Sequence, residues 1–260
     1  MSLPFDIAGP ISGNPRSLLL YGAPKVGKTK VLTNLPGCCI VQVESGADMH
    51  ECIRTPQITS YAHFMQVCDQ IIKAGKPYKY VAFDTVDAME DYALTQATID
   101  YKMSPIGANF KGADVTAELA NGGGYLWLRR ALNRMIDKAF ETIPPDGCVI
   151  FIGHIKEKLL SKEGKDVTAS DISLTGKCAV ILCSRCDAIG HVTRALRPGS
   201  TSRVEDLKVS FRTTELVNCG SRYDHLAGQD FVLSPGDTKL AAWDKIFKPA
   251  VAQTGTGSAV

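Results

Sequence analysis

Residues 22–29 read Gly-Ala-Pro-Lys-Val-Gly-Lys-Thr and match the phosphate-binding pattern G-x-x-x-x-G-K-[ST] at every position. The apolar run at 17–21 before it predicts a buried strand. The apolar residues after it predict a short helix that ends at Pro36-Gly37. A glycine-rich turn with a chance Lys-Thr pair is the alternative, but strand, loop and helix in this order are the context that the pattern requires.

The residue types in the loop indicate what each position does. Gly22 and Gly27 let the backbone curl until its N–H groups point at a phosphate chain, and the helix dipole strengthens that field. Lys28 is expected to reach the β- and γ-phosphates, and Thr29 to offer its hydroxyl to Mg²⁺. The sequence therefore predicts a site for ATP and Mg²⁺, with the nucleotide contacted by Gly22, Ala23, Pro24, Lys25, Val26, Gly27, Lys28, Thr29 and Lys30.

Composition limits the function classes. The net charge of the 260 residues is only +2, so a nucleic-acid site would have to be a local basic patch. No apolar run approaches the roughly 18 residues of a membrane span, and no signal peptide precedes the first strand, which predicts a soluble, cytoplasmic protein. Nine cysteines in such a chain are expected to be reduced. The single C-x-x-C at 183–186 favours structural packing over a zinc or redox site.

Predicted strands and helices alternate along the chain, which is typical of an α/β fold with a mostly parallel central sheet covered by helices on both faces. Late strands at 188–196 and 204–211 are expected to form a β-hairpin that extends the sheet. Two polar, glycine-containing segments, 102–124 and 157–171, predict loops. We expect a flexible arm at 1–15, one core at 16–248 and a disordered tail at 249–260. Further strands are expected at 39–43, 80–83 and 148–152, and helices at 61–74, 86–101, 125–143 and 174–186.

Three polar residues follow predicted strands, where the ligands of such sheets bind. Asp84 ends the strand 80–83 and is a candidate to hold Mg²⁺ through water; capping of the next helix is its alternative role. Glu44 ends the second strand, which is expected directly beside the strand that bears the loop if the strand order is the usual one. Glu44 is a candidate to activate water; the alternative is a surface turn residue. His154 follows the fourth strand and is a candidate γ-phosphate sensor, or a histidine with a structural role only.

Taken in order, these elements resemble a RecA-type ATPase core. More closely, the chain resembles the phage-encoded, core-only RecA-like ATPases linked to single-strand annealing recombination. The resemblance spans about residues 16–247. It rests on Leu19–Thr29, Val43–Gly46, Val81–Thr85, Gly153-His154, and Leu174–Lys177 before Cys186-Asp187.

The resemblance implies an ATP-dependent protein that assembles as a filament or ring on single-stranded DNA, in a bacterial host cell, and promotes annealing or strand pairing. It also implies that the loops at 102–124 and 156–176 face DNA. Phosphate neutralisation and base stacking would then bind single strands without sequence preference, with Tyr101 and Phe110 as stacking groups. A solvated charged loop is the alternative. The implied DNA-contacting lysines are Lys102, Lys111, Lys156, Lys158, Lys162, Lys165 and Lys177.

In RecA-like assemblies ATP lies between subunits, and basic residues of the neighbour reach the γ-phosphate. Arg222 falls where relatives carry a Lys-x-Arg pair, but Gly220 stands where the lysine would be. This departure leaves slow hydrolysis, substitution by Lys177 or Arg212, or a plain surface role for Arg222 as open alternatives.

Two other functions remain open from the sequence. One is a nucleotide-switched loader or mediator that binds a recombinase or a single-strand-binding protein. The other is a small-molecule kinase, against which the chain lacks an evident arginine-rich lid.

Overall fold

The computed structural model describes residues 13–162, 165–196, 205–233 and 243–248, and the side chains of all of these except 158–168 and 233. The predicted arm and tail lie outside the described residues, apart from 13–15. There, Asn14 is tied to the other end of the core, because its side chain exchanges two hydrogen bonds with the backbone of Lys248.

One mixed sheet organises the described residues, with strand order β10–β8–β7–β1–β5–β4–β2–β3. Neighbours from β7 to β3 run parallel, whereas β8, β9 and β10 pair antiparallel at the other edge. The strands are β1 (Ser17–Gly22), β2 (Cys38–Gln42), β3 (Ile53–Arg54), β4 (Tyr80–Asp84), β5 (Cys148–Lys162), β6 (Lys165–Ile172), β7 (Ala188–Leu196), β8 (Glu205–Ser210), β9 (Gly220–Ser221) and β10 (Asp230–Leu233).

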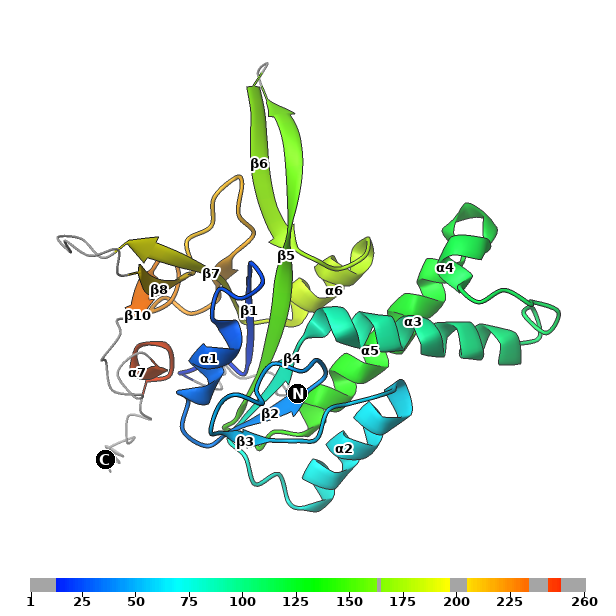
Figure 1. Ribbon diagram of the computed structural model, residues 1–260, viewed down its shortest axis with the longest axis horizontal. Helices are drawn as coiled ribbons and strands as arrows, with labels where there is room; N and C mark the ends of the chain where they lie inside the picture. Colours follow the sequence, from blue (N-terminus) through cyan, green and yellow to red (C-terminus); the bar gives the residue numbers. More distant parts are fainter. Residues whose placement is uncertain (1–12, 163–164, 197–204, 234–242, 249–260) are drawn as a thin grey trace, which may run out of the picture.

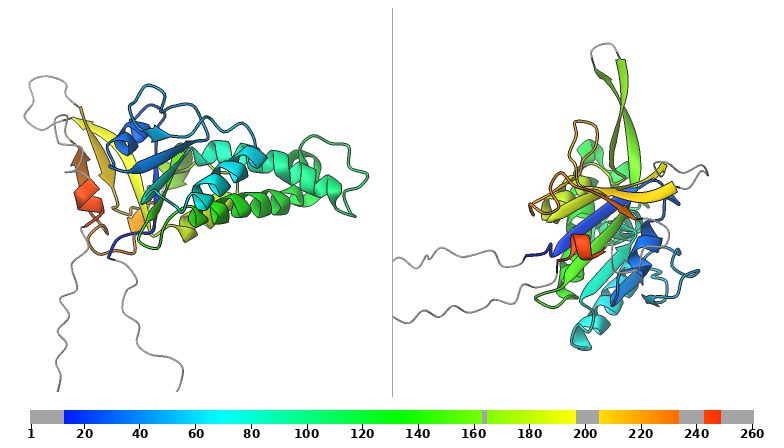
Figure 2. Two further views of the ribbon diagram at one scale, coloured as in Figure 1. Left: turned by 90° about the horizontal axis from the view of Figure 1, so that it is seen from below. Right: turned by 90° about the vertical axis from the view of Figure 1, so that its left-hand side faces the viewer.

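Helices cover both faces of the sheet (Figures 1 and 2), because successive side chains of a strand point to opposite faces. On β1, Leu18 and Leu20 pack in the same cluster as α1 and α7, whereas Leu19 packs in the cluster of α2, α3, α5 and α6. In the described part of the chain, none of the helices could span a membrane. The helices are α1 (Lys28–Thr33), α2 (Tyr61–Lys73), α3 (Val86–Met103), α4 (Val115–Glu118), α5 (Gly124–Glu141), α6 (Lys177–Arg185), α7 (Trp243–Ile246) and the 3₁₀ turn η1 (Ala120–Gly122).

These elements confirm the predicted alternation and the late hairpin of β7 and β8. The predicted loop at 102–124 is more ordered than expected, because it contains α4 and η1. The Asp114 carboxylate caps α4 by accepting hydrogen bonds from the N–H groups of Thr116 and Ala117.

The sheet order corrects one expectation. Glu44 was expected directly beside the strand that bears the phosphate loop, but β5 and β4 lie between β1 and β2. Strand order is a tertiary property, and hydrophobic pattern predicts strands without predicting which of them are neighbours.

The segment 157–171 was predicted to be a loop, and this prediction was wrong. Instead, β5 continues beyond the sheet and pairs with β6 from Ile155↔Ile172 to Lys162↔Lys165. The resulting two-stranded hairpin projects away from the core (Figures 1 and 2). A projecting ribbon needs no apolar face against a core, so its charged residues do not show the alternation that identifies a half-buried strand.

Phe151 lies at the centre of this sheet, and its substitution provides a test of the packing. The side chain is fully buried on β5, with ring centroids of Phe83 and Phe140 at 5.8 and 6.1 Å. We expect Phe151→Ala to lower the free energy of unfolding by about 3–5 kcal/mol, because it leaves a cavity among groups that cannot collapse. Urea denaturation would measure this change. The exposed Val180 supplies the control, and Val180→Ala should change stability by no more than about 0.5 kcal/mol. Equal effects of the two substitutions would contradict the packing described.

Candidate functional site

The phosphate loop connects β1 to α1. Gly27 has a φ of 115°, in the left-handed region that favours glycine, and it directly precedes the first residue of the helix. The Lys28 ammonium donates hydrogen bonds to the carbonyl oxygens of Gly22 (2.7 Å) and Ala23 (2.9 Å), and only 5% of the residue is exposed. The lysine is therefore folded over the loop that it belongs to.

A hydroxyl and a carboxylate meet beside the loop. Thr29 Oγ1 donates a hydrogen bond of 2.6 Å to Asp84 Oδ2, which joins the start of α1 to the end of β4. These oxygens fit Mg²⁺, because hard oxygen ligands from one or two residues and the substrate phosphates are what this ion prefers. The two residues predicted to hold the metal are thus brought together.

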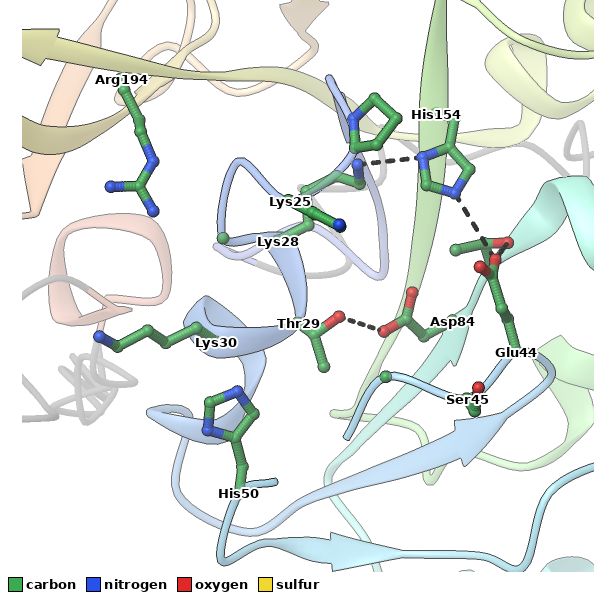
Figure 3. Close-up of a pocket in the computed structure, with 14 residues that line it drawn as sticks. Lys25, Lys28, Thr29, Lys30, Glu44, Ser45, His50, Asp84, His154 and Arg194 are labelled. Carbon is green, nitrogen blue, oxygen red and sulfur yellow. Dashed lines mark hydrogen bonds and ion pairs between the residues drawn. The ribbon is translucent and has the colours of Figure 1, made fainter. Parts of the chain in front are cut away.

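Two further predicted residues close this side of the pocket (Figure 3). His154 Nδ1 lies 3.3 Å from Lys28 Nζ, and His154 Nε2 lies 3.5 Å from Glu44 Oε2. Glu44 Oε2 also accepts a hydrogen bond from Thr85 Oγ1 at 3.0 Å. Although β2 is distant from β1 in the sheet, the backbone N–H of Glu44 donates to Asp84 O and turns the residue toward the pocket.

Burial shifts the ionisation of these groups. It lowers the pKa of Lys28, while the carboxylates of Asp84, Asp87 and Glu44 act in the opposite direction. It raises the pKa of Asp84, partly offset by the hydrogen bond from Thr29 and the charge of Lys28. Burial also raises the pKa of Asp87, whose carboxylate accepts a hydrogen bond from the backbone N–H of His154. Such desolvated charges are typical of functional sites.

The pocket has a volume of about 470 Å³, in the range of small-molecule sites. Gly22, Ala23 and Val26 form the loop without lining this pocket, but other predicted residues do line it: Pro24, Lys25, Gly27, Lys28, Thr29, Lys30, Glu44, Asp84 and His154. Five lining residues were not predicted as site residues from the sequence: Ser45, Gly46, His50, Thr85 and Arg194. Arg194 lies two positions after the buried Val192 on β7, and only the pairing of β7 with β1 brings it to the loop.

Arg222 lies outside this pocket. Its guanidinium pairs with Asp187 at 3.0 Å and donates to Ser184 O at 2.8 Å. Asp187 directly precedes β7, at the sheet edge opposite the phosphate loop, since the neighbouring Ala188 pairs with Leu18 at the start of β1. Within one subunit Arg222 is therefore remote from the nucleotide pocket, and its expected action on a neighbouring subunit stays a prediction.

Among the described side chains, the predicted DNA-contacting lysines do not form one cluster. Lys102 and Lys111 are exposed near the outer end of α3, whereas Lys156 donates a hydrogen bond to Leu174 O at the base of the hairpin. Lys177 is exposed at the start of α6. The hairpin and the outer end of α3 project in different directions (Figure 1). Three of the lysines have side chains outside the described residues, although their backbones lie in the hairpin strands: Lys158, Lys162 and Lys165.

The two expected stacking groups pack inside the protein. The Tyr101 ring lies 5.2 Å from that of Phe110 and 5.5 Å from that of Trp127, edge to face in both pairs. Both residues are half-buried against the hydrophobic core. These contacts stabilise the outer end of α3 and leave each ring only partly exposed, and the expected stacking on bases stays a prediction.

Asp84 offers a test of this site that does not need catalysis. Because its raised pKa disfavours the charged form in the folded state, stability is lost as pH rises from the ordinary carboxyl pKa through the raised one. Asp84→Asn removes that penalty, so thermal denaturation at neutral pH should give a Tm no lower than that of the unaltered protein. The stabilisation by Mg²⁺ and ATP should nevertheless be lost.

Asp146→Asn, at an exposed ion pair with Lys79, is the control and should keep the stabilisation by Mg²⁺ and ATP. A large fall in Tm for Asp84→Asn without nucleotide would contradict the electrostatic account of the site.

Comparison with known proteins agrees with this geometry. A family model described as an AAA domain matches residues 14–223, which is most of the chain and includes every element of the pocket. No curated protein sequence matches the chain. The matched domain is of the P-loop ATPase-like kind. This agrees with the phosphate loop, the mostly parallel sheet and the helices on its two faces. The chain belongs to the AAA domain family.

Proposed function

We propose that this protein is an ATPase with a RecA-like core that binds single-stranded DNA and promotes annealing or strand pairing during recombination. The observation that carries the proposal is the continuity of β5. This strand runs without a break from the sheet, past His154 in the pocket, to Lys162 in the hairpin. A structural change at the nucleotide would therefore be transmitted through this single strand to the hairpin, which is the element proposed to contact DNA.

The pocket supplies the groups that ATP hydrolysis needs. Lys28 and the loop backbone bind the phosphates, while Thr29 and Asp84 hold Mg²⁺. When bound, Mg²⁺ neutralises charge on the phosphate oxygens. Glu44 accepts a proton from the attacking water, since its carboxylate faces the pocket beside His154 and is half exposed. His154 lies between Lys28 and Glu44 and is suited to respond to the γ-phosphate.

Both backbone polar groups of His154 are hydrogen-bonded, which supports a role in coupling the nucleotide to the hairpin. Its N–H donates to Asp87 at 2.8 Å, and its carbonyl accepts from Ser173 N–H at 2.9 Å. Ser173 directly follows β6, so a shift of His154 would move both strands of the hairpin at their base. Two discrete arrangements of this packed element would give the hairpin a different position in each state of the bound nucleotide.

The hairpin is suited to an external partner. A two-stranded ribbon is marginally stable alone, and three of its residues are the lysines 158, 162 and 165. Single-stranded DNA would be bound through phosphate neutralisation. Arg222 lies at the ends of the strands opposite the phosphate loop, so its action on ATP would require the pocket of a neighbouring subunit, as in a filament or ring.

A loader or mediator is the second candidate. It is favoured by the packing of Tyr101 and Phe110 against each other and by Gly220, which stands where the resemblance implies a lysine. In that case the hairpin would bind a recombinase or a single-strand-binding protein, for instance by adding a strand at its edge.

ATP hydrolysis with and without DNA separates the two candidates. We expect a single-stranded oligonucleotide to stimulate turnover more than the matching duplex, and Lys28→Ala to lower turnover at least tenfold by removing a charged phosphate ligand, worth about 1.5–3 kcal/mol. A variant with Lys158, Lys162 and Lys165 changed to alanine should keep DNA-free turnover and lose the stimulation. No stimulation of the unaltered protein, with nucleotide binding intact, would favour the loader.

Glu44→Gln tests the proposed base. The amide cannot accept the proton, so turnover should fall by about 10²–10⁴-fold while ATP binding is kept. Turnover is measured as phosphate release and binding as calorimetric affinity for ATP. Near-normal turnover would remove Glu44 from the mechanism.

A further inference from the structure

Arg194 enters the nucleotide pocket from the side opposite Glu44 and His154 (Figure 3). The sheet explains this placement. Gly22, at the start of the loop, pairs with His154 of β5 on one side and with Val192 of β7 on the other. Since neighbouring strands are about 4.8 Å apart, β5 and β7 flank the loop at roughly 10 Å from each other. Arg194 follows Val192 by two residues and so lies on the same face of β7, at the outer end of the strand.

The contacts of Arg194 fix it against the loop without burying it. Its Nε donates a hydrogen bond of 3.1 Å to the carbonyl of Val26, and Nη1 lies 3.7 Å from Glu205 Oε2. A Cβ atom placed on Gly27 would lie 3.9 Å from Nη2. About half of each charged side chain is exposed, 49% for Arg194 and 47% for Glu205. The guanidinium is thus oriented by one good hydrogen bond and one loose ion pair.

The direction of the phosphate chain follows from the other residues. Lys28 lies beside His154 and Glu44, so the γ-phosphate belongs at that end of the loop. The remainder of the nucleotide must then leave the loop toward β7. On that side the pocket is lined by Arg194 and Lys30. The planar guanidinium of Arg194 has several N–H donors and suits a phosphate with several acceptor oxygens. The Glu205 carboxylate, at 3.7 Å, is too far away to accept a good hydrogen bond from it.

We infer that Arg194 binds the nucleotide on the α-phosphate side of the loop, and that Glu205 competes with the nucleotide for it. On binding, the phosphate replaces the Glu205 carboxylate while the hydrogen bond to Val26 keeps the guanidinium in position. This inference rests on the proposed nucleotide-binding function, but it does not depend on DNA or on hydrolysis.

Calorimetric titration of the full chain with ADP and with a non-hydrolysable ATP analogue, at one fixed ionic strength, tests it. Arg194→Ala should weaken both ligands by a similar factor, about tenfold or more, because both carry the α-phosphate. Arg194→Lys should recover part of that loss. Glu205→Gln should tighten both ligands about two- to fivefold, as expected on removing a half-exposed competing charge. In the double variant the effect of Glu205→Gln should disappear, because there is no arginine left to release.

The matched control is Lys79→Ala, which removes a positive charge from a similarly loose and exposed ion pair, with Asp146 at 3.5 Å. It should leave both affinities unchanged. Weakening of the ATP analogue alone by Arg194→Ala would assign the residue to the γ-phosphate and overturn the inference. A neutral or weakening effect of Glu205→Gln would overturn the competition and leave Arg194 as a brace for the loop. If the unaltered protein bound neither ligand, the proposed function itself would fail.

Discussion

The insertion of β5 between β1 and β4 is the constraint on which the site depends. Its register pairs Gly22 with His154 and Asp84 with Ile152, so the loop, the metal-binding carboxylate and the histidine emerge at one edge of the sheet. Backbone hydrogen bonds between buried strands hold this register, because a slip by one residue would turn every apolar side chain to the wrong face. A single arrangement of strands thereby fixes the relative positions of groups from distant parts of the chain.

The same arrangement places charged groups where their solvation is poor. Lys28 and Asp84 are both 5% exposed, and burial shifts the pKa of each toward the neutral form. Hydrogen bonds from Lys28 to two loop carbonyls and from the Thr29 hydroxyl to Asp84 offset part of that cost. A site prepared in this way favours a ligand that carries both phosphate charge and a cation, which agrees with the AAA domain family to which the chain belongs.

The hairpin and Arg194 both belong to strands whose earlier residues pack in the core of the sheet. β5 contributes Phe151 to the core and then, a few residues later, His154 to the pocket and the hairpin to solvent. β7 contributes Val192 to the core and Arg194 to the rim of the pocket. Rigid elements with buried inner halves can hold such side chains in fixed positions more accurately than loops can.

Local pattern and periodicity were enough to predict the phosphate loop, the alternation of strands and helices, and the polar residues that end the strands. Other features became evident only in the folded chain: Glu44 reaches the pocket across β4, 157–171 belongs to a hairpin, and Arg194 faces the loop whereas Arg222 does not. These features follow from strand order and long-range pairing, which depend on how whole apolar faces pack together. A short window of residues carries the pattern of its own element, but it does not carry the identity of its neighbours.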